Sequence, residues 1–193
     1  TLDTIAQMEI DLPRAASLLP PAAQFDAIGY ACTSGTTLIG ADKVAALVQA
    51  SATTQSVSNP LTAAIAALTA LKARSVGIVS PYVPAVAEPI KAAFETAGFA
   101  VPTTLSFGEQ VEARVARIDP QSIHDAALEV AKTEAVEAIF LSCTNLRTLD
   151  VIAEIEDRTG LPVISSNQVL AWHMARAANL SSAITAPGRL FSN

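Results

Sequence analysis

The chain has 193 residues, of which 51% are hydrophobic and 5% aromatic, and its formal net charge is −6 at pH 7. This composition predicts a globular α/β protein with a sizeable core and excludes a basic nucleic-acid-binding surface. No apolar run is long enough for a membrane span, and no signal peptide is visible. We therefore expect a cytoplasmic protein without membrane or nucleic-acid partners.

The first half of the chain alternates helices and strands. Apolar spacing and turn signals predict a helix over 1–19 that Pro13 can break, a strand over 25–31, a polar loop over 32–37, a helix over 41–51, a brief strand within 53–58 and a helix over 60–73. Asn59 and Pro60 mark the start of the last helix, because asparagine is a good N-cap and proline fits the first helical position. Since an α/β unit normally opens on a strand, we expect a strand ahead of residue 1.

The second half continues the alternation. It predicts strands over 75–80, 101–107, 136–142 and 161–165, and helices over 84–97, 120–133, 147–159 and 168–178. Gly98 and Gly160 are predicted to end helices, and Ser166-Asn167 to cap one. The segment 108–118 shows no clear pattern, and the tail 181–193 is predicted to have little regular structure.

An internal repeat with an offset of about 111 residues organises the chain. Residues 25–38 (FDAIGYACTSGTTL) match 136–149 (VEAIFLSCTNLRTL) at several positions, so that Cys32 corresponds to Cys143 and Thr33 to Thr144. These are the two cysteines of the chain, and each follows a predicted strand, where ligands bind in open α/β sheets.

The repeat also predicts the architecture. Each half reads strand, cysteine loop, helix, short strand, Ser-Asn and helix, and this alternation is typical of parallel sheets. We expect an α/β fold with two pseudo-symmetric lobes, each a small doubly wound parallel sheet flanked by helices, and an active site between them. The first lobe would comprise 1–73 and 166–193, and the second 74–165.

The positions of the cysteines indicate a reactive thiol pair. Without a CxxC motif or clustered histidines they do not form a zinc or thioredoxin-type site, and we expect them to be reduced in a cytoplasm, although a disulfide between them is possible in principle. Each precedes a predicted helix, where backbone N–H groups and the helix dipole lower the pKa of a thiol and bind anions. Such a site suits a dicarboxylate or an amino acid. The groups expected around it are Thr33, Ser34, Thr36, Thr37, Thr144, Thr148 and the amide of Asn145.

Two reactions fit thiols that face each other across a cleft. In a racemase one thiolate removes an α-proton and the opposite thiol returns a proton to the other face. In a cis–trans isomerase one thiolate adds to a double bond while the other thiol delivers or removes a proton, and the adduct rotates before elimination. Neither scheme needs a metal or an organic cofactor, and the motif alone does not separate them.

The cysteine motifs ACTSGTT at 31–37 and SCTNLRTLD at 142–150, together with SPY at 80–82 and GLPVISSN at 160–167, resemble those of the aspartate/glutamate racemase superfamily. The resemblance covers nearly the whole chain. It is to the branch of maleate cis–trans isomerase and arylmalonate decarboxylase, which includes an ectoine-utilisation protein. It implies two pseudo-symmetric lobes, no cofactor, Cys32 as the nucleophile that attacks an alkene, Cys143 as the partner acid or base, and Tyr82 as a contact to a substrate carboxylate.

Candidate substrate-binding residues follow from the same motifs: Thr33, Ser34, Gly35, Tyr82, Thr144 and Asn145. Arylmalonate decarboxylases resemble this branch but carry glycine where this chain has Cys32, so decarboxylation is the less favoured activity. The branch's N-terminal strand and its asparagine loop have no counterpart in this sequence. The branch also tends to have asparagine in the region 108–118, where this chain has Glu109, Gln110, Glu112 and Arg114.

The favoured interpretation is a cytoplasmic, cofactor-independent isomerase that acts on a small dicarboxylate of maleate type and forms a homodimer. A racemase for aspartate or glutamate stays open, as does a non-catalytic, two-lobed carboxylate-binding protein. Outside the motifs, His124 and His173 are expected to be surface or core residues, and Trp172 and Met174 core or subunit-contact residues. Arg147 is expected to be a solvated helix residue.

Overall fold

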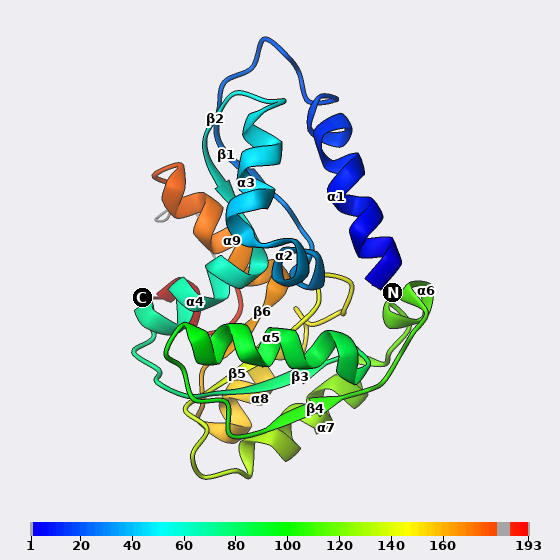
Figure 1. Ribbon diagram of the computed structural model, residues 1–193. Helices are drawn as coiled ribbons and strands as arrows, with labels where there is room; N and C mark the ends of the chain where they lie inside the picture. Colours follow the sequence, from blue (N-terminus) through cyan, green and yellow to red (C-terminus); the bar gives the residue numbers. More distant parts are fainter. Residues whose placement is uncertain (1, 181–185, 193) are drawn as a thin grey trace.

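The computed structural model describes residues 2–180 and 186–192 as an α/β structure with two parallel sheets (Figure 1). Its first half contains α1 (Leu2–Ala16), β1 (Phe25–Gly29), α2 (Thr33–Ile39), α3 (Ala41–Gln49), β2 (Thr54–Ser58) and α4 (Pro60–Ala70). Its second half contains β3 (Val76–Ser80), α5 (Pro84–Thr96), β4 (Thr104–Ser106), α6 (Glu112–Val115), α7 (Pro120–Ala131), β5 (Ala138–Leu141), α8 (Ile152–Thr159), β6 (Val163–Ser165), α9 (Ser166–Ala177) and η2 (Arg189–Ser192). The predicted fold class, α/β with parallel sheets flanked by helices, is confirmed.

The larger sheet has the strand order β4-β3-β5-β6, and all its neighbouring strands run parallel. Its inner strands β3 and β5 are buried along their whole length, as apolar strands covered on both faces are. On one face α7 packs against β3 and β5. On the other, Phe94 of α5 meets Phe140 of β5 edge to face, with ring centroids 5.4 Å apart.

The smaller sheet pairs β1 with β2 in parallel. A separate small core lies beside it, in which Leu12 and Ala16 of α1 pack with Val44 and Val48 of α3. Helix α9 follows β6 of the larger sheet directly, yet it packs against α4, β1 and β2 (Figure 1). The end of the chain therefore returns to the sheet formed by its beginning.

Helix α1 continues through Pro13, so the break that the sequence suggested there is wrong. A proline inside a helix removes one backbone hydrogen bond. The burial of Leu12 and Ala16 on either side of it offsets that loss, and the carbonyl of Pro13 still accepts from the N–H of Ser17 at 3.0 Å.

The two cysteine segments differ from their predicted structure and from each other. The polar loop expected over 32–37 is instead the start of α2, while the helix expected from 147 begins only at Ile152. Cys32 caps α2 by accepting from the N–H of Gly35 at 3.3 Å, and the hydroxyls of the helix find acceptors in the preceding turn: Thr36 donates to the carbonyl of Cys32 at 2.7 Å and Thr37 to that of Thr33 at 3.0 Å. The predicted symmetry therefore does not extend to these two segments.

Helix starts and ends were predicted with mixed success. Asn59 caps α4, accepting from the N–H of Thr62 at 2.8 Å, and Gly160 ends α8 in the left-handed conformation at φ 72°, both as predicted. Helix α9, however, begins at Ser166 with Ser165 as its cap, so Ser166 and Asn167 are not capping residues. The predicted tail contains the short helix η2, and its residues 181–185 and 193 lie outside the described ones. Within the described ranges, no helix combines the length and the apolar character that crossing a membrane requires.

Candidate active site

The two cysteine segments meet where the sheets approach each other. The hydroxyl of Thr144 donates to the carbonyl of Ala31 at 2.9 Å, which ties the second segment to the first. Ser166, at the start of α9, makes a second connection: its Oγ lies 2.8 Å from the hydroxyl of Thr33 and accepts from the N–H of Cys143 at 3.0 Å. The sequence had presented Ser166 only as a cap, and no local pattern revealed this bridging contact.

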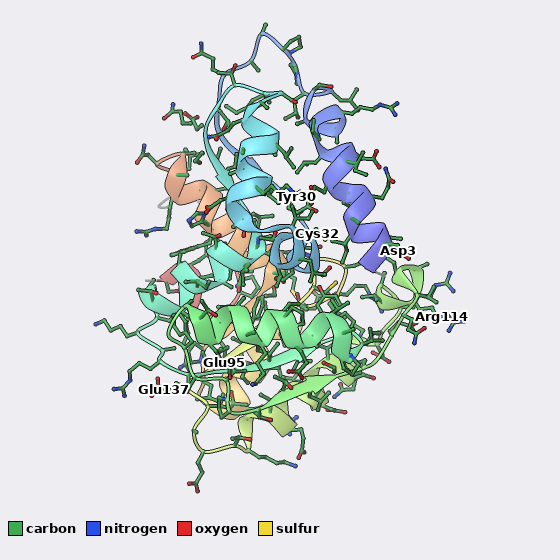
Figure 2. All side chains as sticks on the ribbon, in the orientation of Figure 1. Asp3, Tyr30, Cys32, Glu95, Arg114 and Glu137 are labelled. Carbon is green, nitrogen blue, oxygen red and sulfur yellow. The ribbon has the colours of Figure 1, made fainter. Side chains whose placement is uncertain are left out.

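Cys32 is the N-cap of α2, and its thiol is half-buried and free. Its Sγ accepts from the N–H of Gly35 at 3.3 Å and lies 3.7 Å from the hydroxyl of Ser34. The hydroxyl of Tyr30 donates to the Sδ of Met8 at 3.7 Å and also lies beside this thiol; Figure 2 shows Tyr30 and Cys32 next to each other in the middle of the molecule. The N–H of Gly35 is therefore a donor directed at the sulfur of Cys32 from the first turn of α2.

Tyr30 was not identified from the sequence. Burial raises the pKa of its phenol well above the usual range, and the neighbouring Cys32 adds to the rise. Gly35 gives this hydroxyl its room, because a Cβ at that position would lie 2.3 Å from the Tyr30 hydroxyl and 3.0 Å from the Cys32 Sγ. Glycine is therefore needed at position 35 for the tyrosine to reach the thiol.

Cys143 has a different environment. Its thiol is free and buried, and its backbone φ is 145°, a strained value for a residue with a side chain. Burial raises the pKa of the thiol, Glu112 and Cys32 add to the rise, and hydrogen bonds from Tyr82 and from the N–H of Asn145 oppose it. The expectation that this cysteine precedes a helix and has a lowered pKa is wrong, because turns separate it from α8.

Tyr82 connects the two thiols. It follows β3 and is only 9% exposed, and its hydroxyl bonds to Cys143 and to Ser34 while Cys32 acts on it at longer range. Burial and the two thiols raise the pKa of its phenol well above the usual range. The phenol is therefore a neutral hydrogen-bond donor at physiological pH.

Most of the other hydroxyls expected around an anion are already used within the protein. The hydroxyl of Thr33 bonds to Ser166, those of Thr36 and Thr37 to the start of α2, and that of Thr144 to Ala31. Thr148 is buried. Of the expected hydroxyls, that of Ser34 remains beside Cys32 and Tyr82.

The amide groups of two asparagines meet the Cys143 segment. Asn145 donates from Nδ2 to the main-chain oxygen of Glu112 at 3.1 Å and to its Oε1 at 2.8 Å. Asn167 donates to the carbonyl of Thr144 at 2.8 Å instead of capping α9. Within the described part of the chain, no group of three histidine, cysteine or acidic side chains is arranged to hold a metal ion.

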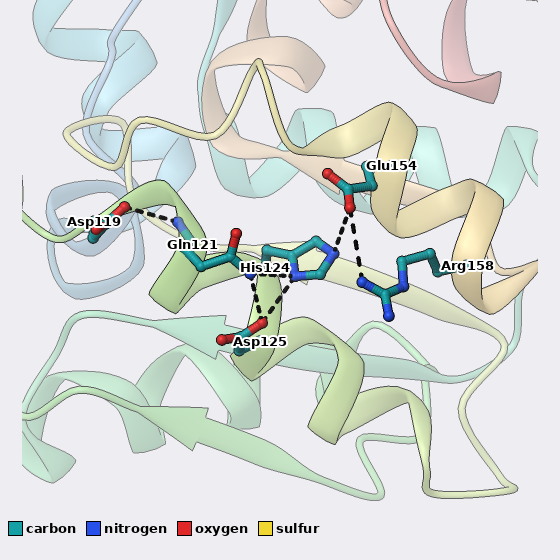
Figure 3. Close-up of polar contacts among 6 residues, drawn as sticks. All are labelled: Asp119, Gln121, His124, Asp125, Glu154 and Arg158. Carbon is teal, nitrogen blue, oxygen red and sulfur yellow. Dashed lines mark hydrogen bonds and ion pairs between the residues drawn. The ribbon is translucent and has the colours of Figure 1, made fainter.

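The remaining candidates lie elsewhere. His124 is buried between α7 and α8, with Asp125 3.0 Å from Nδ1 and Glu154 3.5 Å from Nε2 (Figure 3); no hydrogen bond is formed at Nε2. His173 bonds through Nδ1 to Ser58 at 2.8 Å. Trp172 is a core residue as expected, whereas Arg147 is exposed in the turns before α8.

A surface cavity of about 440 Å³ lies away from the cysteines, at the starts of β3 and β5. It is lined by Leu71, Lys72, Ala73, Arg74, Glu137, Pro162 and Arg189. Ligands of parallel α/β sheets bind at the opposite edge, where the strands end, and that is where both cysteines lie. The cavity therefore lies at the opposite edge of the larger sheet from the two cysteines.

Comparison with known proteins gives consistent matches along the chain. The sequence matches the arylmalonate decarboxylase family over residues 15–191. A maleate isomerase of Pseudomonas putida is 27% identical over 198 residues, covering 98% of this chain and 78% of that protein. The arylmalonate decarboxylase of Bordetella bronchiseptica is 37% identical over 135 residues, covering 67% of this chain and 55% of that protein. The crystal structure of a variant maleate isomerase from a Pseudomonas putida strain, with maleate, superposes with a TM-score of 0.85 at 26% identity, covering 100% of this chain and 79% of that one.

Proposed function

Because the chain belongs to the arylmalonate decarboxylase family, which it matches over residues 15–191, we propose that it is a cofactor-independent cis–trans isomerase of maleate type. The observation that carries this proposal is the pair of free thiols connected by the Tyr82 hydroxyl. Maleate isomerases among the relatives support the choice of reaction. The small carboxylate substrate would lie between the two thiols.

Cys32 is the nucleophile in this proposal. Its thiolate adds to one alkene carbon, a carbon–sulfur bond forms, and the π electrons move to the adjacent carbon and into its carboxylate. The donors at Gly35, Ser34 and Tyr30 stabilise the thiolate before it attacks and again when it leaves.

Cys143 is the partner acid. Since burial raises the pKa of its thiol, it is protonated at neutral pH and can deliver its proton to the carbanion. The carbon–carbon bond of the adduct is then single and rotates. The Cys143 thiolate takes the proton back, the carbon–sulfur bond breaks, and the trans alkene and the Cys32 thiolate are formed, so that no net electron or proton is consumed.

The other predicted site residues hold the substrate or the thiols. Ser34 and Tyr82 would donate to a substrate carboxylate, with Tyr82 as a neutral phenol between the thiols, while Gly35 would border the substrate and keep its N–H on Cys32. Thr33 and Thr144 would act through Ser166 and Ala31, which they bond, by fixing the two cysteine segments to each other. The role proposed for Asn145 is to position Cys143, toward which its N–H points at 3.4 Å from Sγ.

The test is proton NMR of the protein with maleate in D₂O. Fumarate formed by the wild type, and lost by more than about a hundredfold in Cys32→Ala and in Cys143→Ala, is the expected result. Cys32→Ser is the matched control for shape, because it keeps a hydroxyl but not a good nucleophile. Full turnover in either alanine variant would rule out the two-thiol mechanism.

Two other functions give distinct results in the same experiment. Deuterium entering the α-position of L-aspartate or L-glutamate, without conversion of maleate, would identify a racemase. Ligand binding without any turnover would identify a carboxylate-binding protein.

We also propose that the chain divides into two lobes, 1–73 with 166–193 and 74–165, and that it acts as a homodimer in the cytoplasm. The packing of α9 against α4, β1 and β2 supports this division. Light scattering of the purified protein tests the dimer, for which a monomer mass would be the contrary result.

A further inference from the structure

Glu112 brings a negative charge to the Cys143 side of the site. It is the first residue of α6, a short helix in the segment between β4 and α7 that runs past the Cys143 turns. The amide of Asn145 holds it there, with one bond to its main-chain oxygen at 3.1 Å and one to its carboxylate at 2.8 Å. Asn145 also contacts the thiol itself, because its backbone N–H donates to the Cys143 Sγ at 3.4 Å.

These bonds occupy the N–H donors of the Asn145 amide, which are then not available to a substrate carboxylate at this position. A side-chain amide has two N–H donors on its nitrogen, and the nitrogen of Asn145 bonds two oxygens of Glu112. The site therefore presents acceptor oxygens of Glu112 where a free asparagine would present donors. The charge also reaches the thiol, because Glu112 contributes to the raised pKa of Cys143.

The Cys32 side has the opposite character. The N–H of Gly35 and the hydroxyls of Ser34 and Tyr30 surround that thiol. These groups donate hydrogen bonds and suit a carboxylate. A ligand that spans the two thiols thus meets donors at one end and a carboxylate at the other.

We propose that Glu112 is a specificity-determining residue, and that it selects a substrate with one carboxylate and, at the Cys143 end, a group that donates hydrogen bonds, such as a primary amide or an ammonium. This inference rests on the proposed function, which puts the substrate between the two thiols. A dianion would bring a second carboxylate against that of Glu112, and juxtaposed like charges lower the affinity for such a ligand. The cis monoamide of maleic acid has the required pattern of groups.

The test uses three unreactive ligands with the same chain length: succinate, succinamate and 4-aminobutanoate. Calorimetric titration measures their affinities for the wild type, Glu112→Gln and Glu109→Gln. The glutamine at 112 can still accept from Asn145, so the segment keeps its contact. Glu109 is the matched control, because it belongs to the same segment and loses the same charge, while its Oε1 contacts only the nearby N–H of Val111 at 2.8 Å among its described bonds.

The wild type and Glu109→Gln are expected to bind succinamate, 4-aminobutanoate or both at least about tenfold more tightly than succinate. In Glu112→Gln this preference is expected to disappear or reverse. Comparison of the amide with the ammonium identifies which donor the site accepts. Equal affinities in the wild type, a preference that Glu112→Gln leaves unchanged, or no binding of any of the three ligands would overturn the proposal.

Turnover is followed separately, by NMR with maleate and with its monoamide. If the ligand preference depends on Glu112 but neither alkene is isomerised, the specificity inference stands and the proposed isomerase function falls. If maleate is isomerised equally by the wild type and Glu112→Gln, and the binding preference is absent, the function stands and the inference falls.

Discussion

Tyr30 and Tyr82 are the two tyrosines of the chain, and the hydroxyl of each lies beside one of the two cysteines. The sequence pointed to Tyr82 through SPY at 80–82, but as a contact to a substrate carboxylate and not to a cysteine. The Tyr30 contact could not be expected from the sequence, since it depends on the turn from β1 into α2 and on the space above Gly35. Each thiol in this site therefore has a phenol as a neighbour.

Removing the Tyr30 hydroxyl should slow the reaction of Cys32 with iodoacetamide. In a Cys143→Ala background Cys32 is the only thiol, and its alkylation rate at neutral pH is expected to fall about threefold to tenfold in Tyr30→Phe, because a thiolate loses a charge-assisted hydrogen bond. In denaturant the two proteins should react at the same rate. An equal or faster rate for the folded phenylalanine variant would show that the hydroxyl does not support the thiolate.

Whether a site residue could be predicted from the sequence depends on how far apart in the chain its contacts lie. Cys32 and Cys143 could be found because a repeat and strand ends mark them within short windows of sequence. Ser166 could not be assigned its contact, because the bond to Thr33 joins residues 133 positions apart and nothing near Ser166 encodes it. The strained backbone of Cys143 was equally invisible, since only the folded turn shows its φ of 145°.

At the scale of elements, α2 shows how a helix can start from a sequence that indicates a loop. Its run of threonine and serine disfavours a helix in isolation. In the fold, the Cys32 thiol caps the first turn by accepting from the N–H of Gly35, and the hydroxyls of two threonines bond back to the preceding turn. The segment after Cys143 shares the motif but directs Thr144 and Asn145 to other segments. The two cysteine motifs are similar, but one starts a helix and the other forms turns, because their side chains bond to different partners.

Gly35→Ala tests the fit between α2 and β1. Alanine would normally favour a helix by up to about 1 kcal/mol, but here its Cβ would lie 2.3 Å from the Tyr30 hydroxyl. We expect the free energy of unfolding to fall by about 1–3 kcal/mol as the ring and helix move apart. Urea unfolding measures it.

The double variant Gly35→Ala/Tyr30→Phe separates this cause from a general defect in α2. Deleting the hydroxyl removes the shortest contact, so the alanine should cost less in the phenylalanine background, and the two changes should be non-additive. Additive effects would show that the tyrosine hydroxyl is not what requires glycine.

For the whole molecule, the buried acids of the site lower the free energy of unfolding at alkaline pH. Cys143, Tyr82 and Tyr30 all have pKa values raised by burial above their usual 9.0 and 10.0. Such acids keep their protons in the folded chain after the unfolded chain has lost them. The folded state therefore binds more protons, and the free energy of unfolding falls as the pH rises above about 9.

We expect the midpoint of urea unfolding to be lower at about pH 10.5 than at about pH 8. The variant Tyr30→Phe/Tyr82→Phe should show a smaller decrease, because two of the three titrating groups are gone. A midpoint that stays constant over this range, or the same decrease in both proteins, would contradict this account of the buried acids.

The overall α/β class could be predicted because strands and helices alternate with clear apolar periods. The unequal sizes of the two sheets could not, since the repeat suggested two similar halves, while the described structure pairs two strands in one and four in the other. Sheet size depends on which strands find partners across the molecule, and a repeat within one chain does not determine this.

The position of α9 has a consequence for how the protein is made. Ser166 at its first turn bonds both Thr33 and the N–H of Cys143, and the helix packs on β1 and β2 from the start of the chain. A ribosome synthesises α9 after every other described residue of the site, and larger chains fold in stages as they emerge. The connection through Ser166 can therefore form only when synthesis has passed α9, so that a nascent chain carries both cysteines for some time before this connection is made.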